Sequence, residues 1–105
     1  MIFDKYLNQS YLNILYTNYD ENYLLSIDED NFKDVYMLLK EEGFYFIDDI
    51  ILNYLELFQI DVEYVRKAFT KIKEMVGSNY IKVVGTNMDI LDKVIDLAYE
   101  FSNVE

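Results

Sequence analysis

The 105-residue sequence contains no cysteine, no histidine and no proline, and it has only three glycines. Cysteine and histidine supply the commonest catalytic nucleophile, the commonest general base and most ligands of transition metals. Their absence rules out Ser–His–Asp and Cys–His catalytic sets, and the glycines form no phosphate-binding loop. We therefore expect a protein that is not an enzyme and that holds no cofactor and no metal ion.

Basic side chains are scarce as well: nine stand against twenty carboxylates, for a formal net charge of -11. A chain this acidic is repelled by nucleic acids and by anionic membrane surfaces. The longest apolar stretch, residues 50–58, is interrupted by Asn53 and Glu56 and is far too short to span a membrane. The N-terminus lacks the basic region of a signal peptide. We expect a soluble, cytoplasmic protein that binds no membrane and makes no direct contact with nucleic acid.

What the chain has in quantity is apolar surface: 52% of its residues are hydrophobic and 17% are aromatic. This composition excludes intrinsic disorder, and the length suits one domain. The absence of proline removes the strongest helix breaker, and apolar residues recur at helical spacing throughout. We predict an all-α fold: a single domain over residues 1–105 with four to five helices, packed as an orthogonal bundle or as a short helical-repeat stack.

The spacing of the apolar residues also defines where the helices are expected. They cover residues 31–42, 47–58, 61–76 and 88–102, with a further helix within residues 4–18. Asp28 or Asp30 is expected to cap the first of these segments and Asp61 the third, and Gly43 and Gly77 are expected to end them. Residues 80–84 are rich in β-branched side chains. We expect a helical turn or a connector there, with a short strand paired to residues 23–27 as the alternative.

A five-residue pattern occurs twice, as Leu-Leu-Ser-Ile-Asp at 24–28 and as Leu-Phe-Gln-Ile-Asp at 57–61, 33 residues later. The helices that follow keep this offset in their apolar positions. Ile90 and Leu91 fall at the next step of the same spacing. The pattern indicates either a repeated pair of helices that stack on a shared core, or a chance alignment of two amphipathic helices of equal length.

Residues 38–44, Leu-Leu-Lys-Glu-Glu-Gly-Phe, are followed by Ile50 and Ile51. This stretch resembles the helical repeats of mitochondrial transcription terminator-like proteins, in which a Leu-rich helix that ends in Gly leads into an Ile-rich helix. The resemblance covers about half of the sequence and implies a helical-repeat fold. The chain departs from that family because residues 53–55 lack its usual proline, and because its nucleic-acid-binding members are basic. We therefore do not assign the chain to it.

Acidic and aromatic residues gather around the junction of the second and third expected segments. Glu41, Glu42, Asp48 and Asp49 flank a Phe-Tyr-Phe run centred on Tyr45. Aromatic side chains supply contact area at low entropic cost, and the surrounding carboxylates would select a basic partner. The alternative is that the two phenylalanines, and even the tyrosine, simply fill the core between helices.

The last expected helix carries a stripe of carboxylates at helical spacing. The stripe consists of Asp89, Asp92, Asp96 and Glu100. It is either an ordinary solvated helix face or a docking strip for a basic partner. No concave arrangement that would hold a metal ion or a sugar is indicated.

The only basic cluster lies in the helix over residues 61–76 and consists of Arg66, Lys67, Lys71 and Lys73. We expect these side chains to pair with nearby acids, for example Lys67 with Glu63 at i,i+4 spacing.

The eleven tyrosines cannot all be deeply buried in a core this small, because each buried hydroxyl needs a hydrogen-bond partner.

These features favour a small acidic protein that inhibits or neutralises a more basic partner protein. An immunity protein against a toxin and a phage-encoded inhibitor of a nucleic-acid-handling enzyme are the cases we expect, since carboxylates can occupy a site built for phosphates. One alternative is a structural or regulatory subunit that homodimerises through the helix over 47–58. Another is a helical-repeat nucleic-acid accessory protein that uses residues 66–73.

Overall fold

The computed structural model describes residues 1–104, which form seven α-helices and two short 3-10 helices and contain no strand. The elements are η1 (Ile2–Lys5), α1 (Gln9–Asn18), α2 (Glu21–Leu25), α3 (Glu29–Glu42), α4 (Ile47–Asn53), η2 (Leu55–Gln59), α5 (Val62–Val76), α6 (Tyr80–Thr86) and α7 (Ile90–Val104). The all-α prediction is confirmed. The predicted number of four to five helices is too low, because two predicted helices are divided and the short α2 and α6 were not predicted as helices of their own.

The predicted helix over 47–58 is interrupted at Tyr54, whose φ of -135° and ψ of 44° are not helical. The interruption has a packing reason. Residues two apart on an α-helix point to nearly opposite sides, so a continuous helix could not bury both Leu55 and Leu57 in one core. With η2 in place of a continuation of α4, both side chains are at most 1% exposed.

The predicted helix within residues 4–18 is also divided, into η1 and α1. The chain turns at Asn8, whose side-chain oxygen caps α1 by accepting a hydrogen bond from the Tyr11 backbone N–H at 3.0 Å. Residues 80–84 belong to α6, so the strand alternative is wrong. Tyr80 and Val84, one helical turn apart, are the buried residues of α6.

The helix ends that the sequence marked most clearly occur where predicted. Asp28 caps α3 by accepting a hydrogen bond from the Asn31 backbone N–H at 2.8 Å, and Asp61 caps α5. Gly43 and Gly77 follow α3 and α5 with φ of 99°, a conformation that favours glycine. The last helix begins at Ile90, two residues later than expected.

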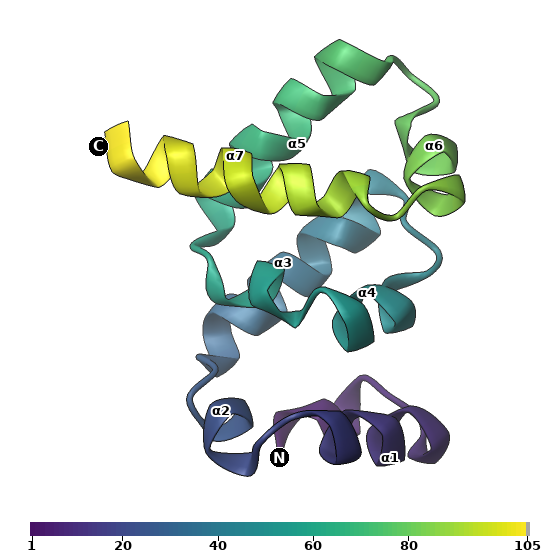
Figure 1. The fold of residues 1–105 in the computed structure, drawn as a ribbon, viewed down its shortest axis with the longest axis vertical. Coiled ribbons are helices and arrows are strands. Elements are labelled where there is room, and N and C mark those ends of the chain that lie inside the picture. Colours follow the sequence, from purple (N-terminus) through teal and green to yellow (C-terminus); the bar gives the residue numbers. More distant parts are fainter. Residues whose placement is uncertain (105) are drawn as a thin grey trace.

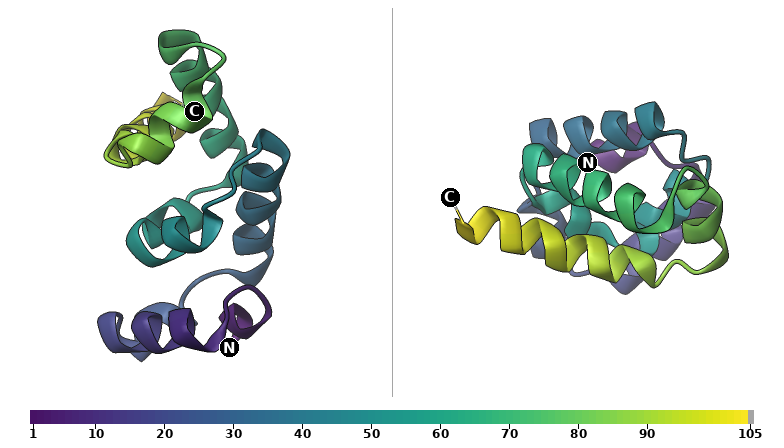
Figure 2. Two further views of the ribbon diagram at one scale, coloured as in Figure 1. Left: turned by 90° about the vertical axis from the view of Figure 1, so that its right-hand side faces the viewer. Right: turned by 90° about the horizontal axis from the view of Figure 1, so that it is seen from above.

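The helices are arranged in three levels (Figures 1 and 2). Helix α1 lies in the lowest level, α3 and α4 lie in the middle level, and α5 and α7 lie in the uppermost level. Helix α5 begins 33 residues after α3, and α6 begins 33 residues after α4, so the element bounds repeat at the spacing seen in the sequence. The third step of that spacing, at Ile90 and Leu91, has no matching element in the structure. Ile90 and Leu91 open α7, because no 3-10 helix comparable to η2 follows α6.

One continuous core joins the levels, and its side chains come from every helix. The packing of α5 against α7 is the most extensive contact between elements, followed by α3 against η2 and α5. At the lower end, the ring of Phe32 contacts Phe3 at a centroid distance of 5.3 Å and Phe58 at 4.7 Å. Phe32 therefore connects η1, α3 and η2 through aromatic contacts.

Asn31 ties the start of α3 to the start of α5. Its side-chain Nδ2 donates hydrogen bonds to the backbone carbonyls of Phe58 at 2.9 Å and Ile60 at 2.7 Å. Its Oδ1 accepts a hydrogen bond from the Val62 backbone N–H at 3.1 Å. One amide group thus satisfies three backbone groups of the connection between η2 and α5.

Within residues 1–104, no helix combines the length and the apolar character needed to cross a membrane.

Candidate functional site: an acidic surface with a tyrosine-lined pocket

The structure separates the predicted partner-binding residues into two sets, and the first set is paired within the chain. Glu42 Oε2 lies 3.2 Å from Lys73 Nζ, and Glu41 Oε2 lies 4.0 Å from Arg66 Nη1. Both pairs connect the end of α3 to α5. These two glutamates therefore help to neutralise the basic helix, and less of their charge is left for a partner.

The prediction that the basic cluster pairs with nearby acids is confirmed for Arg66, Lys71 and Lys73. Arg66 Nε lies 3.7 Å from Glu63 Oε1, and Lys71 Nζ lies 4.0 Å from Glu74 Oε2. The ammonium group of Lys67 lies 5.8 Å from the centre of the Tyr64 ring. Positive charge on α5 is thus balanced locally, although exposed pairs of this kind contribute little to stability.

The second set carries charge that no ion pair among the described residues engages, although Lys93 lies on α7 beside Asp92. Asp48 and Asp49 lie in the first turn of α4, while Asp89 and Asp92 lie at the start of α7. Among the residues that the structure describes, none of the four forms an ion pair with a lysine or arginine. Two of them accept hydrogen bonds from tyrosine hydroxyls instead. Tyr11 donates to Asp49 Oδ1 at 3.3 Å, and Tyr54 donates to Asp89 Oδ1 at 3.5 Å.

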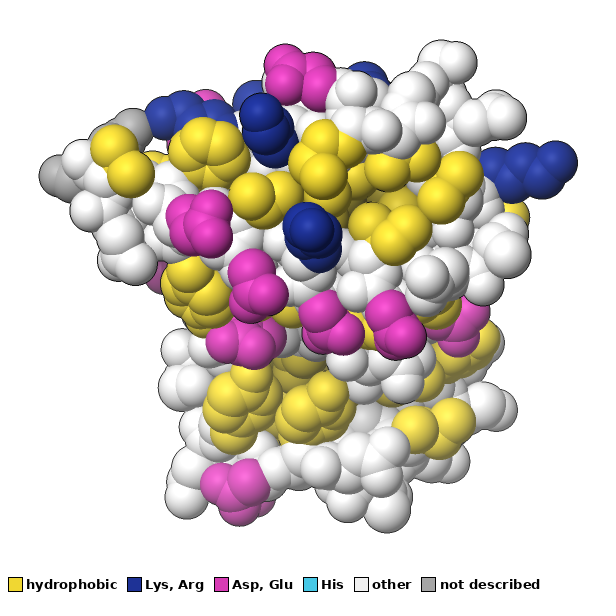
Figure 3. Space-filling model, turned by 45° about the horizontal axis from the view of Figure 1, so that its top comes forward, with side chains coloured by type: hydrophobic (Ala, Val, Ile, Leu, Met, Phe, Trp, Pro, Cys, Tyr) yellow, Lys and Arg dark blue, Asp and Glu magenta, His cyan; other side chains and the backbone are white. Residues whose placement is uncertain are grey.

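Asp96 and Glu100 continue the carboxylate stripe along α7, and both are exposed. Figure 3 shows acidic side chains that follow one another across this face, with hydrophobic side chains directly below them. We call the set Asp48, Asp49, Glu56, Asp89, Asp92, Asp96 and Glu100 the acidic surface. Its members come from α4, η2 and α7, so it forms only when these elements pack.

A hollow of about 230 Å³ opens in the acidic surface between the lower levels and α7. It is lined by Tyr19, Tyr23, Asn53, Tyr54, Leu55, Glu56, Asp92 and Ile95. We call it the acid–tyrosine pocket. The rings of Tyr19 and Tyr23 are stacked, with centroids 5.8 Å apart and an interplanar angle of 14°. The Tyr19 hydroxyl donates to the Leu52 carbonyl at 2.9 Å, which fixes the orientation of its ring.

The carboxylates of the pocket act on the tyrosines around them. Tyr99 on α7 donates a hydrogen bond of 2.7 Å to Glu56 Oε1, and this bond, together with burial, raises the pKa of Tyr99 to about 12. Burial and then the charges of Asp92 and Asp89 raise the pKa of Tyr54 above its usual value. The two pKa shifts have the same sign because burial and nearby carboxylates both oppose the loss of the tyrosine proton.

Replacing Glu56 with glutamine tests this coupling. We expect the pKa of Tyr99 to fall from about 12 toward the ordinary tyrosine value, because the charged acceptor is lost. A spectrophotometric titration of the tyrosines measures the shift, and a Tyr99→Phe variant identifies the transition. A Glu100→Gln variant is the matched control, since it removes a charge next to Tyr99 in sequence without touching the hydrogen bond. Superimposable curves for Glu56→Gln and the parent would contradict the assignment.

The same shift predicts a pH dependence of folding. The pKa of Tyr99 is raised in the folded state, so the folded chain holds the proton more tightly than the unfolded chain does. The resulting stabilisation is complete below the ordinary tyrosine pKa of about 10. It is lost as the pH rises through about 12.

The Phe-Tyr-Phe run is mostly structural. Phe44 is buried and Phe46 is half-buried, as the core alternative expected, whereas Tyr45 is 80% exposed. The Tyr45 hydroxyl lies over α6, where a Cβ added to Gly85 would be 3.4 Å from it. Tyr45 is therefore the exposed aromatic residue of the predicted partner-binding set, and it lies in the connection just before α4, which carries Asp48.

The sequence pattern did not identify Glu56 or the tyrosines of the pocket as functional candidates. The reason is the predicted continuous helix over 47–58, which hid the change of direction at Tyr54. A signal was available in Leu55 and Leu57, since two leucines at that spacing cannot share one helical face with Ile50 and Ile51.

No group of three or more acidic side chains within residues 1–104 is arranged to hold a metal ion. The chain matches no family model, no curated protein and no solved structure. The function is therefore argued from the geometry of the acidic surface and its pocket.

Proposed function

We propose that the protein is a small acidic binding module that inhibits or neutralises a more basic partner protein. The observation that carries the proposal is the segregation of charge. Carboxylates of α4, η2 and α7 form no ion pair within the described residues, even with Lys93 on α7, whereas Arg66, Lys71 and Lys73 of α5 are paired with acids. A surface with unbalanced negative charge and partly exposed tyrosines suits a cationic protein.

The mechanism needs no chemical step. Unbalanced carboxylates attract a basic surface over a distance of about one Debye length and raise the association rate. Tyrosine rings then supply buried contact area at low entropic cost. If the partner is a nucleic-acid-handling enzyme, the carboxylates of Asp89 and Asp92 would occupy positions that phosphates otherwise take. An immunity protein or a phage-encoded inhibitor, acting in the cytoplasm, fits this mode of action.

The test begins with affinity capture from lysates of the source organism and its host, washed at low and then at high salt. For a basic protein recovered in this way, the double variant Asp89→Asn, Asp92→Asn is expected to lower the association rate about tenfold and to flatten its salt dependence. Stopped-flow kinetics measures both quantities, and an activity assay of the partner measures inhibition.

The matched control is Asp30→Asn, Asp34→Asn on α3, which removes the same charge from exposed positions outside the acidic surface. An equal loss of rate in this control would show that only net charge matters. Unchanged kinetics in the Asp89, Asp92 variant would contradict the proposed function.

The two alternative functions gain no support from the geometry. The apolar side chains of α4 and η2 are inside the chain: Ile50, Ile51 and Phe58 are fully buried, so this segment offers no apolar face for a homodimer. The basic residues of α5 are engaged by acids and by an aromatic ring, which disfavours a role in holding nucleic acid.

A further inference from the structure

The acid–tyrosine pocket contains two carboxylates from different elements. Glu56 comes from η2 and Asp92 from α7. Glu56 uses Oε1 to accept the Tyr99 hydroxyl, and its Oε2 has no partner within the described residues. The Asp92 carboxylate forms no hydrogen bond and no ion pair with any described residue. The pocket lining therefore includes carboxylate oxygens from two elements that have no hydrogen-bond or ion-pair partner among the described residues.

Its other walls are aromatic and apolar. The stacked rings of Tyr19 and Tyr23 and the half-buried ring of Tyr54 line it, and Leu55 and Ile95 are buried beside them. A flat cation can lie on a tyrosine ring, and an aliphatic stem can contact leucine and isoleucine. The polar and apolar parts of the lining thus match one long basic side chain.

Arginine fits this lining better than lysine. Its guanidinium group is planar, stacks on aromatic faces and presents five donors in a fixed fork, so it can bond to two carboxylates at once. The lysine ammonium is a compact, strongly hydrated charge with no flat face. Two carboxylates and three tyrosines around a hollow of about 230 Å³ favour the planar cation.

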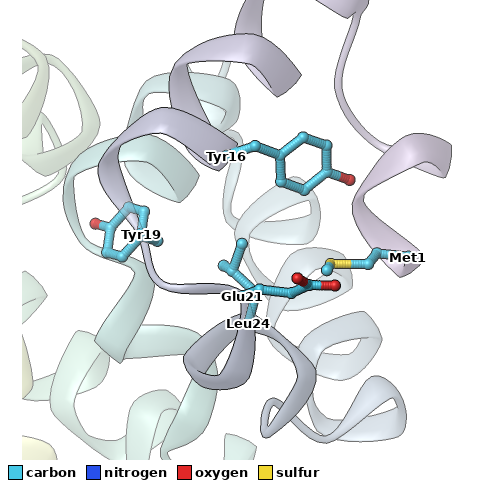
Figure 4. A pocket seen from close by; sticks show the side chains of 5 residues that line it. All are labelled: Met1, Tyr16, Tyr19, Glu21 and Leu24. Atoms are coloured by element: carbon cyan, nitrogen blue, oxygen red, sulfur yellow. The ribbon is translucent and has the colours of Figure 1, made fainter.

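A neighbouring hollow of about 320 Å³ lacks this combination. It is lined by Met1, Tyr16, Tyr19, Glu21 and Leu24 (Figure 4). Figure 4 shows Tyr16 and Tyr19 directed to opposite sides, with the Glu21 carboxylate turned toward Met1. One carboxylate without a second one facing it cannot bind both edges of a guanidinium group. The acid–tyrosine pocket is therefore the better receptor of the two.

We propose that the acid–tyrosine pocket binds one arginine side chain of the basic partner, with the guanidinium group held between Glu56 and Asp92 and against the tyrosine rings. This inference rests on the proposed function and specifies what the acidic surface recognises. The partner would then be chosen by an exposed arginine in the correct position and not by positive charge alone.

Two fluorescein-labelled peptides, one of six arginines and one of six lysines, test the inference by fluorescence anisotropy. The two peptides carry equal charge. The parent protein is expected to bind the arginine peptide about fivefold more tightly. In the Glu56→Gln, Asp92→Asn variant this preference should disappear. In the matched Asp96→Asn, Glu100→Gln variant, both affinities should fall together and the preference should remain.

The outcomes separate this inference from the proposed function. Equal binding of both peptides, weakened by Asp89→Asn, Asp92→Asn, would overturn the arginine pocket and leave the acidic binding surface standing. An arginine preference that survives the Glu56, Asp92 variant would also overturn the pocket. If neither peptide bound, both the arginine pocket and the acidic binding surface would be refuted. Glu56 and Asp92 are exposed, so circular dichroism is expected to show a folded variant in each case.

Discussion

Replacing Phe32 with alanine is expected to lower the free energy of unfolding by about 3–5 kcal/mol. The Phe32 side chain is fully buried, and its ring contacts Phe3, Tyr6 and Phe58 at centroid distances of 5.3, 5.1 and 4.7 Å. Truncation removes these contacts and leaves a cavity where η1, α3 and η2 meet. Urea unfolding followed by circular dichroism measures the change.

Small domains have a total free energy of unfolding of about 5–15 kcal/mol, so the alanine variant could approach complete unfolding. Phe32→Leu is the milder variant that keeps the measurement possible, because it retains most of the buried volume. Met37→Ala, on the same helix but at a side chain that is 45% exposed, is the control and should change stability by less than about 1 kcal/mol. If Phe32→Ala and Met37→Ala unfolded at the same urea concentration, the central role of this ring would be refuted.

Replacing Asn31 with alanine is expected to cost about 2–4 kcal/mol of unfolding free energy. The Asn31 side chain makes three hydrogen bonds to the backbone, and all three are partly buried. Its loss leaves the Phe58 and Ile60 carbonyls and the Val62 N–H without their partner. The midpoint of thermal unfolding measures the effect, with a decrease of about 10–20 °C expected for a domain of this size.

Two further variants make the interpretation specific. Asn31→Asp keeps the shape of the side chain but turns two donated hydrogen bonds into contacts between a carboxylate and carbonyl oxygens, so it should destabilise at least as strongly as alanine. Asn13→Ala, at an exposed position on α1, should change stability by no more than about 0.5 kcal/mol. A stable Asn31→Asp protein would mean that the amide is not the connection between α3 and α5.

Sequence patterns predicted the fold well where spacing and end signals agree. Helices α3 and α5 each have an apolar stripe, an aspartate cap and a terminal glycine, and the structure reproduces all three features. The patterns failed where nearly every residue is apolar. Between Ile47 and Phe58 the periodicity carries little information, so the break at Tyr54 was decided by packing against α3 and not by local preference.

The candidate site was only partly predictable for a related reason. Charge can be read from a sequence, so the carboxylates of α4 and α7 could be selected as candidates for partner binding, and that role stays a prediction. Whether a carboxylate is balanced depends on which helix lies beside it. Glu42 meets Lys73 because α3 packs on α5, whereas Asp92 of α7 and Glu56 of η2 line one pocket. Both arrangements are tertiary and leave no local signal.

The arrangement of the helices in levels has a consequence for cooperativity. Each level contacts mainly its neighbours, and α7 is held chiefly by α5. In structures of this kind the terminal element can detach at a lower free energy than the whole chain unfolds, which amide hydrogen exchange reports as early exchange of that element. Detachment of α7 would carry Asp92 away from Glu56 and dismantle the pocket between them. A partner bound in this pocket would therefore also stabilise the packing of α7 and slow the exchange of its amide hydrogens.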